Sequence, residues 1–124
     1  MLTIYGIPNC DTCRKARKWL DRKSVQYRFH DFRIDGLDIE TLTRWADRTD
    51  WQELLNTRSL TWRKIPQADR EDISRGNAIS LMLVQPTLIK RPVLECEAFI
   101  AIGFSPEQYA DLINQPELDV NSSD

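Results

Sequence analysis

The apolar positions near the amino end of the chain change their period twice. Leu2–Tyr5 is a short β-prone run closed by Gly6 and Pro8, which predicts a buried strand. Residues 12–23 then carry apolar side chains at helical spacing, and residues 25–30 alternate between apolar and polar like a second strand. These segments together predict a strand–helix–strand unit with a right-handed crossover.

The middle of the chain returns to helical spacing after a turn predicted at Asp35–Gly36. Residues 37–48 form the next predicted helix, and Asp38 is placed to cap its amino end. Asp50 is placed to cap a further, shorter helix. The stretch 56–66 has no clear period, so we expect it to be a connecting loop.

The last third of the chain first returns to helices and then to strands. Residues 69–74 and 77–85 indicate two helices, separated at Gly76 and stopped by Pro86. The final predicted elements are a hairpin and a helix: strands at 93–96 and 99–102 with a turn near 97–98, then a helix that begins at Ser105 and continues to Ile113.

The order of these elements predicts the fold class. A strand–helix–strand unit, several helices, and then two strands and a helix describe an α/β thioredoxin/glutaredoxin-like fold with an inserted helical subdomain. We expect one domain over residues 1–115, with the helical insertion at about residues 37–86. Residues 116–124 are polar and acidic, and we expect a disordered tail there.

The composition narrows the classes of function. The chain has 124 residues, of which 41% are hydrophobic and 29% charged, which suits one compact soluble domain. Its net charge of −2 argues against direct nucleic-acid binding, because attraction to phosphates needs a basic excess. No apolar run is long enough to span a membrane, and the first residues resemble no secretory leader. Three cysteines, an odd number, do not form the disulfide framework of secreted proteins, so we expect a cytoplasmic protein.

Cys10 and Cys13 stand where the first predicted strand passes into the first predicted helix. The first turn of a helix has unpaired N–H groups and the positive end of the helix dipole, which stabilise a thiolate. Cys10 precedes the helix and is the candidate attacking thiol, while Cys13, one turn inside, is the candidate resolving thiol. The carboxylate of Asp11 opposes ionisation of Cys10, and Arg14 and Arg17 offset it if either side chain folds back.

A zinc site is the main alternative for the two cysteines. Structural zinc takes four ligands, and the remaining candidates are Cys96 and His30, which are single and far apart in the sequence. We therefore expect no metal and favour redox chemistry. Cys96 is interpreted as a small buried side chain and His30 as a scaffold residue.

Arg91–Pro92, just before a predicted strand, is the second candidate position. A proline there marks a strand boundary or, in a thioredoxin-like arrangement, lies against the catalytic turn with a cis peptide bond. Arg58 and Arg91 are candidates to bind an anion, since guanidinium groups bind carboxylates in a two-pronged manner; the alternative is two solvated loop arginines. We group Asn9 with Arg58, Arg91 and Pro92 as candidate anion- and substrate-binding residues.

Three separated segments, Gly6–Arg17, Leu55–Ser59 and Leu88–Pro92, resemble the ArsC/Spx family of arsenate reductase-like proteins, and within it most closely the YffB group. The resemblance runs from about Met1 to Ile113 and keeps the three motifs in order. It implies a glutaredoxin-like fold with an inserted helical subdomain.

The resemblance also implies roles for individual residues. The nucleophilic cysteine of the glutathione- and glutaredoxin-coupled arsenate reductases matches Cys10, and the family's cis-proline matches Pro92. Of the three arginines that hold the oxyanion there, one matches Arg91 and another falls in the region of Arg58. The third falls near Gly103–Phe104, where this chain has no arginine, so arsenate reduction is kept as an alternative.

The sequence leads to one main hypothesis and a further alternative. The main hypothesis is a glutathione- or glutaredoxin-linked thiol–disulfide oxidoreductase that is a monomer, binds no membrane, and uses glutathione as co-substrate without a tightly bound cofactor. The alternative comes from the Spx regulators, in which a cysteine pair like Cys10 and Cys13 is a redox switch. It implies a regulator that binds the RNA polymerase α subunit.

Overall fold

The computed structural model describes residues 1–114, and these residues form two compact units. The first unit contains residues 1–35 and the described residues from Arg91 onward, and the second contains residues 36–90. The predicted helical insertion at 37–86 falls within the second unit. The grouping of residues 1–115 as one domain stays a prediction, and the predicted tail at 116–124 lies outside the described residues.

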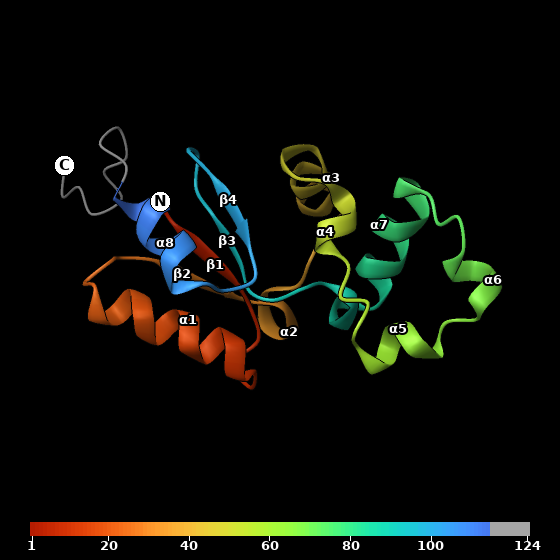
Figure 1. Ribbon diagram of the computed structural model, residues 1–124, viewed down its shortest axis with the longest axis horizontal. Helices are drawn as coiled ribbons and strands as arrows, with labels where there is room; N and C mark the ends of the chain where they lie inside the picture. Colours follow the sequence, from red (N-terminus) through yellow and green to blue (C-terminus); the bar gives the residue numbers. More distant parts are fainter. Residues whose placement is uncertain (115–124) are drawn as a thin grey trace. The chain divides into compact units, whose positions relative to one another are not determined.

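A four-stranded sheet forms the centre of the first unit (Figure 1). Its strands are β1 (Thr3–Gly6), β2 (Arg28–Asp31), β3 (Val93–Glu95) and β4 (Ile100–Ile102). The strand order is β2-β1-β3-β4, with β1 and β2 parallel and the other two pairs antiparallel. The sheet confirms the predicted strand–helix–strand unit, the hairpin and the α/β thioredoxin-like class, although β2 begins at Arg28 rather than at residue 25.

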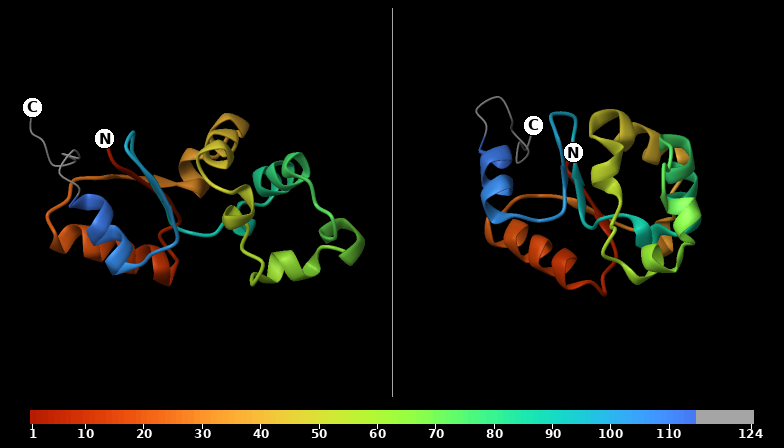
Figure 2. Two further views of the ribbon diagram at one scale, coloured as in Figure 1. Left: turned by 45° about the horizontal axis from the view of Figure 1, so that its top comes forward. Right: turned by 45° about the vertical axis from the view of Figure 1, so that its right-hand side comes forward.

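Two helices, α1 (Asp11–Arg22) and α8 (Pro106–Ile113), cover one face of this sheet (Figure 2). The buried cluster joins side chains of the sheet to side chains of both helices: Ile4, Leu94 and Ala101 with Ala16, Leu20 and Tyr109. Tyr109 also meets the ring of Trp19 edge to face, with 5.8 Å between the ring centroids. This burial fixes the amino end of α1 with respect to the end of β1.

A short helix that the periodicity did not predict, α2 (Phe32–Asp35), follows β2. Its cause is local, because the Asp31 carboxylate accepts a hydrogen bond from the Arg33 backbone N–H at 2.9 Å. An aspartate that satisfies the free N–H groups of a first turn favours a helix there. The segment is too short for an apolar stripe to reveal it.

The second unit is helical and packs around a buried tryptophan. Its elements are α3 (Ile39–Arg48), α4 (Trp51–Leu54), α5 (Leu60–Lys64), α6 (Gln67–Arg70), α7 (Arg75–Val84) and the 3₁₀ turn η1 (Pro86–Leu88). Helices α3 and α7 pack against each other, and Trp45, Leu42 and Met82 from these helices are fully buried. The predicted caps are confirmed, since Asp38 accepts from the Thr41 N–H and Asp50 accepts from the Gln52 N–H.

Three predicted boundaries in this unit are wrong. The stretch 56–66 is not a continuous loop, because the Ser59 hydroxyl accepts from the Trp62 N–H and starts α5. The helix predicted at 69–74 ends at Arg70, and Asp72 has a φ of 53°, which no helix accommodates. Gly76 does not separate two helices, since it lies in the first turn of α7 after the Ser74 cap.

The cap of α8 gives a stability prediction. The Ser105 hydroxyl accepts a hydrogen bond from the Gln108 N–H, and α8 carries the core residue Tyr109. We expect Ser105→Ala to lower the free energy of unfolding by about 1 kcal/mol, the usual cost of losing such a cap. Urea denaturation measures this, with Ser80→Ala on the exposed side of α7 as the control. Equal urea midpoints for the two variants would contradict the role of the cap.

Within residues 1–114, no helix is long and apolar enough to cross a membrane.

Candidate active site

The candidate site lies where β1 ends and α1 begins. Cys10 is the residue directly before α1, with extended backbone at φ −144° and ψ 123°, and Cys13 lies in the first turn. Arg14 closes that turn by donating its backbone N–H to the Cys10 carbonyl at 2.9 Å. The predicted placement of both thiols at the positive end of a helix is therefore what the structure shows.

The surroundings of Cys10 favour its thiolate. Partial burial opposes ionisation and is the largest single effect on its pKa, but several donors act in the other direction. The Cys13 backbone N–H and the Arg91 guanidinium face the sulfur, and together with the Cys13 thiol they hold the pKa of Cys10 below its ordinary value. The backbone N–H does not align as an ideal capping hydrogen bond, so we attribute the lowered pKa to several weak contacts.

Cys13 has the opposite character. Its side chain is fully buried, and this burial raises the pKa of Cys13 to about 11. The backbone N–H of Ile7 lowers that pKa, but the negative charge of Cys10 adds to the increase. The site therefore pairs an outer sulfur whose pKa is lowered with an inner sulfur whose pKa is raised.

Arg91 and Pro92 complete this group of residues. The Arg91–Pro92 peptide bond is cis, as the match to the family's cis-proline implied. The Arg91 guanidinium contacts Cys10, while its Nε is buried and has no hydrogen-bond partner among the described residues. The Pro92 carbonyl accepts from the Gly103 N–H at 2.8 Å, which ties the end of β4 to the segment before β3.

The remaining predicted binding residues, Asn9 and Arg58, belong to different units. Asn9 is exposed on the segment between β1 and α1. Arg58 belongs to the second unit, where its backbone N–H donates to the Asn56 side chain at 3.2 Å. A role for Arg58 at the cysteines stays a prediction.

The cation beside Cys10 is Arg91 and not Arg14 or Arg17, which the sequence offered only if either side chain folds back. Arg14 forms an ion pair with Asp11 and donates to the Pro8 carbonyl. Arg17 lies over the Phe29 ring, with its guanidinium carbon 4.0 Å from the ring centroid. The charge that acts on Cys10 comes from Arg91, which lies far from it in the sequence and close to it only in the folded unit.

Sequence reasoning missed two residues at this site. Gly6 was considered only as the end of a strand, yet a Cβ built on Gly6 would lie 2.5 Å from the Cys13 Sγ. Tyr109 was only one residue of the helix predicted from Ser105 to Ile113, yet its hydroxyl donates to the Gly103 carbonyl at 3.3 Å. Burial, and secondarily the nearby Cys13 charge, raises the pKa of Tyr109, so this hydroxyl stays a neutral donor. No sequence signal separated these residues from ordinary strand-end and core positions.

The other candidate residues have structural surroundings. His30 packs beside Tyr5, with 4.8 Å between the ring centroids, and Cys96 is buried in the core of the first unit. All three cysteines are thiols in this structure. Residues 1–114 contain no cluster of three or more histidine, cysteine or acidic side chains arranged to hold a metal ion.

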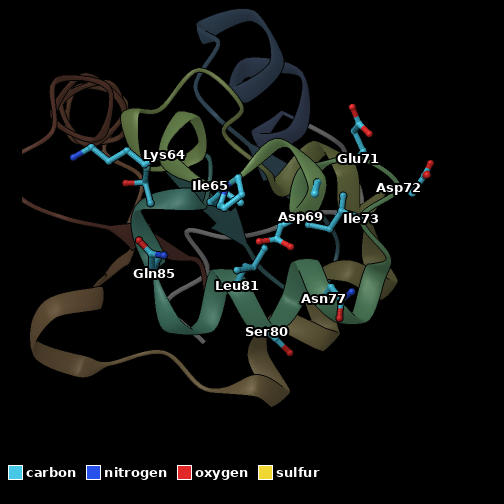
Figure 3. Close-up of a pocket in the computed structure, with 13 residues that line it drawn as sticks. Lys64, Ile65, Asp69, Glu71, Asp72, Ile73, Asn77, Ser80, Leu81 and Gln85 are labelled. Carbon is cyan, nitrogen blue, oxygen red and sulfur yellow. The ribbon is translucent and has the colours of Figure 1, made fainter.

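The second unit contains a hollow of about 690 Å³ between α5, α6 and α7. Its walls combine apolar side chains such as Ile65 and Leu81 with polar ones such as Asp69 and Lys64. Figure 3 shows Asp69 turned toward Leu81, whereas Glu71 and Asp72 point outward. None of the lining residues is a cysteine or histidine, and all three cysteines lie in the first unit.

Comparison with known proteins gives a consistent set of relatives. The ArsC family profile matches residues 5–112. A solved structure of a YffB protein is 46% identical, with a TM-score of 0.85 over 90% of this chain and 97% of that chain. An uncharacterized protein of Haemophilus influenzae is 40% identical over 88% of this chain and 96% of its own length. The global transcriptional regulator Spx of Streptococcus mutans is 29% identical over 87% of this chain and 80% of its own length.

Proposed function

Because this chain belongs to the ArsC family, we propose that it is a thiol–disulfide oxidoreductase that uses Cys10 and Cys13 and is linked to glutathione or glutaredoxin. Family membership supports a thiol oxidoreductase type of function. To this we add the link to glutathione and the assignment of Cys10 and Cys13 as the redox pair. The observation that carries it is the contrast between the two sulfurs: the pKa of Cys10 is lowered beside Arg91, and the pKa of Cys13 is raised in the interior.

The first step is attack of the Cys10 thiolate on a substrate disulfide. The substrate S–S bond breaks, a new S–S bond joins Cys10 to one of its sulfurs, and the other sulfur leaves as a thiolate that takes up a proton. The partly exposed Cys10 sulfur, whose pKa is lowered, suits this role because the thiolate is the nucleophile in such exchange.

The second step is attack of Cys13 on the Cys10 sulfur. Once Cys10 is bonded in a mixed disulfide it has no negative charge, so the charge effect of Cys10 that raises the pKa of Cys13 is removed. Cys13 loses its proton, forms the Cys10–Cys13 disulfide and releases the second thiol of the substrate. The two electrons come from the two cysteines, and two glutathione molecules return them while forming glutathione disulfide.

Arg91 supports an anionic thiol such as glutathione as the reaction partner. Its guanidinium contacts the Cys10 sulfur. A carboxylate of glutathione bound beside Cys10 would accept a charge-assisted hydrogen bond from such a group. Asn9 is exposed directly before Cys10 and is placed to add a polar contact.

Arsenate reduction is a weaker candidate for the same site. The position at which the related arsenate reductases are expected to carry a third arginine falls near Gly103–Phe104. Gly103 is hydrogen-bonded to Pro92, and Phe104 packs against Tyr109 with 4.9 Å between the ring centroids. This place therefore carries a glycine and a core aromatic ring rather than a cation. An arsenate-dependent turnover that is lost in Cys10→Ser would favour this alternative.

The roles of the two cysteines are tested by trapping. We expect Cys13→Ser to accumulate a stable mixed disulfide between Cys10 and glutathione, because the second step is blocked while the first remains. Mass spectrometry after treatment with glutathione disulfide measures the adduct, which we expect at near one per chain and at least tenfold above wild type. Equal adduct on wild type and Cys13→Ser would contradict the resolving role of Cys13.

The relationship to Spx supports a second candidate, a redox-sensing regulator that binds the RNA polymerase α subunit. Retention of this protein on immobilised α subunit, compared in oxidising and reducing buffer, tests it. Retention that depends on the redox state and is lost in Cys10→Ser would favour the regulator.

We place either activity in the cytoplasm, where thiols are kept reduced, and expect the protein to act as a monomer.

A further inference from the structure

We propose that Gly6 is a positioning residue. Because it has no side chain, it leaves the space at the end of β1 that the Cys13 sulfur occupies, and a side chain there would displace this sulfur. The inference concerns the steric relation of Gly6 and Cys13, and its meaning for catalysis rests on the proposed function. Gly6 lies outside the Cys10–Cys13 segment and contacts no substrate in the steps described above.

The close approach of the two residues carries the inference. A Cβ built on the Gly6 backbone would lie 2.5 Å from the Cys13 Sγ, 3.7 Å from the Cys13 Cβ and 3.9 Å from the Pro92 Cβ. The last two are ordinary contacts, whereas the first lies inside the contact distance of the two atoms. Gly6 is buried, so the conflict cannot be relieved by moving the added carbon toward solvent.

The requirement at Gly6 is for space and not for an unusual backbone. The glycines with positive φ are Gly36 and Gly103, so the backbone of Gly6 is one that other residues adopt. Gly6 also pairs in register with Asp31 of β2 at the end of the parallel pair, as a regular strand residue does. A glycine in a strand usually weakens it, and close approach of another group is a common reason for one there.

The place of this sulfur matters because resolution is an intramolecular attack. The Cys13 sulfur must reach the Cys10 sulfur along the axis of the bond that breaks, and a misplacement of about 1 Å can slow such a step about a hundredfold. The sulfur is fully buried between the end of β1 and the first turn of α1. The simplest response to a methyl group at Gly6 is rotation of the Cys13 side chain, which moves the attacking atom.

The kinetic test uses Gly6→Ala with Gly76→Ala as the matched control, since a Cβ on Gly76 of α7 meets no atom within 4 Å. Each reduced protein is mixed with glutathione disulfide, and the decay of the mixed disulfide into the Cys10–Cys13 disulfide is followed by quenching and mass spectrometry. We expect at least tenfold slower decay in Gly6→Ala and wild-type decay in Gly76→Ala. Decay in Gly6→Ala within twofold of wild type, or faster, would overturn the proposal.

A stability test keeps the proposal falsifiable if the activity is absent or Gly6→Ala folds poorly. Thermal unfolding of the reduced protein is compared for Gly6→Ala, Cys13→Ala and the double variant. We expect Gly6→Ala to lower the midpoint by about 5 °C in the wild-type background and by less than about 2 °C in the Cys13→Ala background, because the atom in conflict is then gone. Additive shifts would overturn the steric relation. If wild type forms no mixed disulfide, the proposed function fails, while this cycle still decides the role of Gly6.

Discussion

Cys10→Ser is expected to abolish disulfide reduction, lowering the rate by about a thousandfold or more. A serine hydroxyl does not ionise near neutral pH without a base, so the contacts that lower the pKa of Cys10 have no thiolate to stabilise. Cys13 cannot replace it, because it is fully buried and its pKa is raised to about 11. The measurement is reduction of a glutathione mixed disulfide coupled to oxidation of NADPH by glutathione reductase.

The third cysteine provides the control for this experiment. Cys96 is buried in the core of the first unit and does not contribute to the pKa of Cys10 or of Cys13. We expect Cys96→Ser to keep the activity of wild type within a few fold, with some loss of thermal stability from the buried hydroxyl. Activity that survives in Cys10→Ser, or that is lost in Cys96→Ser at a temperature where the protein is folded, would contradict the assignment.

Parts of the fold that have a clear period or a clear boundary were predictable from the sequence. The run Leu2–Tyr5 and the stripe after Thr12 gave the first strand and helix, and the turn near 97–98 gave the hairpin. In each case local pattern and tertiary burial agree, since the apolar positions are those that enter the core of the first unit. The order of elements was then sufficient to indicate the thioredoxin-like class.

The second unit was harder to predict because its short helices are specified by caps rather than by stripes. Helix α5 contains no buried residue and begins at Ser59, so its five residues carry no apolar period. Helix α7 was hard to predict for a different reason. Its apolar side chains lie on several sides of the helix and form no single stripe, and its start depends on the Ser74 cap. A window long enough to detect periodicity is longer than most of these elements.

The placement of the two thiols was predictable from the sequence, and their surroundings were predictable only in part. A cysteine pair between a strand and a helix is a local pattern, and it identified Cys10 and Cys13 directly. Arg14 and Arg17 were considered as cations beside Cys10 only if a side chain folds back, and in the structure Arg14 pairs with Asp11 and Arg17 lies over Phe29. Arg91 follows the second unit in the sequence and contacts Cys10 only in the folded first unit. Such a contact between distant residues cannot be predicted from their spacing in the sequence.

Arg91→Ala is expected to slow alkylation of Cys10 at neutral pH by about tenfold. The guanidinium stabilises the thiolate through a hydrogen-bonding contact and through its charge, and a hydrogen bond to a charged group contributes roughly 1.5–3 kcal/mol. Burial disfavours the thiolate, and without the guanidinium fewer contacts oppose this effect. The pKa of Cys10 therefore rises. Iodoacetamide reacts with the thiolate form of Cys10, so the pH profile of alkylation moves to higher pH in Arg91→Ala.

The matched control is Arg14→Ala, which removes an arginine from the same end of α1 whose charge is engaged by Asp11. We expect its alkylation profile to stay close to that of wild type. Arg91→Lys is expected to lie between wild type and Arg91→Ala, because a lysine restores the charge but not the planar group of donors. Profiles that coincide for Arg91→Ala and wild type would show that the backbone N–H and the thiol of Cys13 hold the thiolate without Arg91. The anion-binding role proposed for Arg91 would then have to be tested separately, through the KM for glutathione.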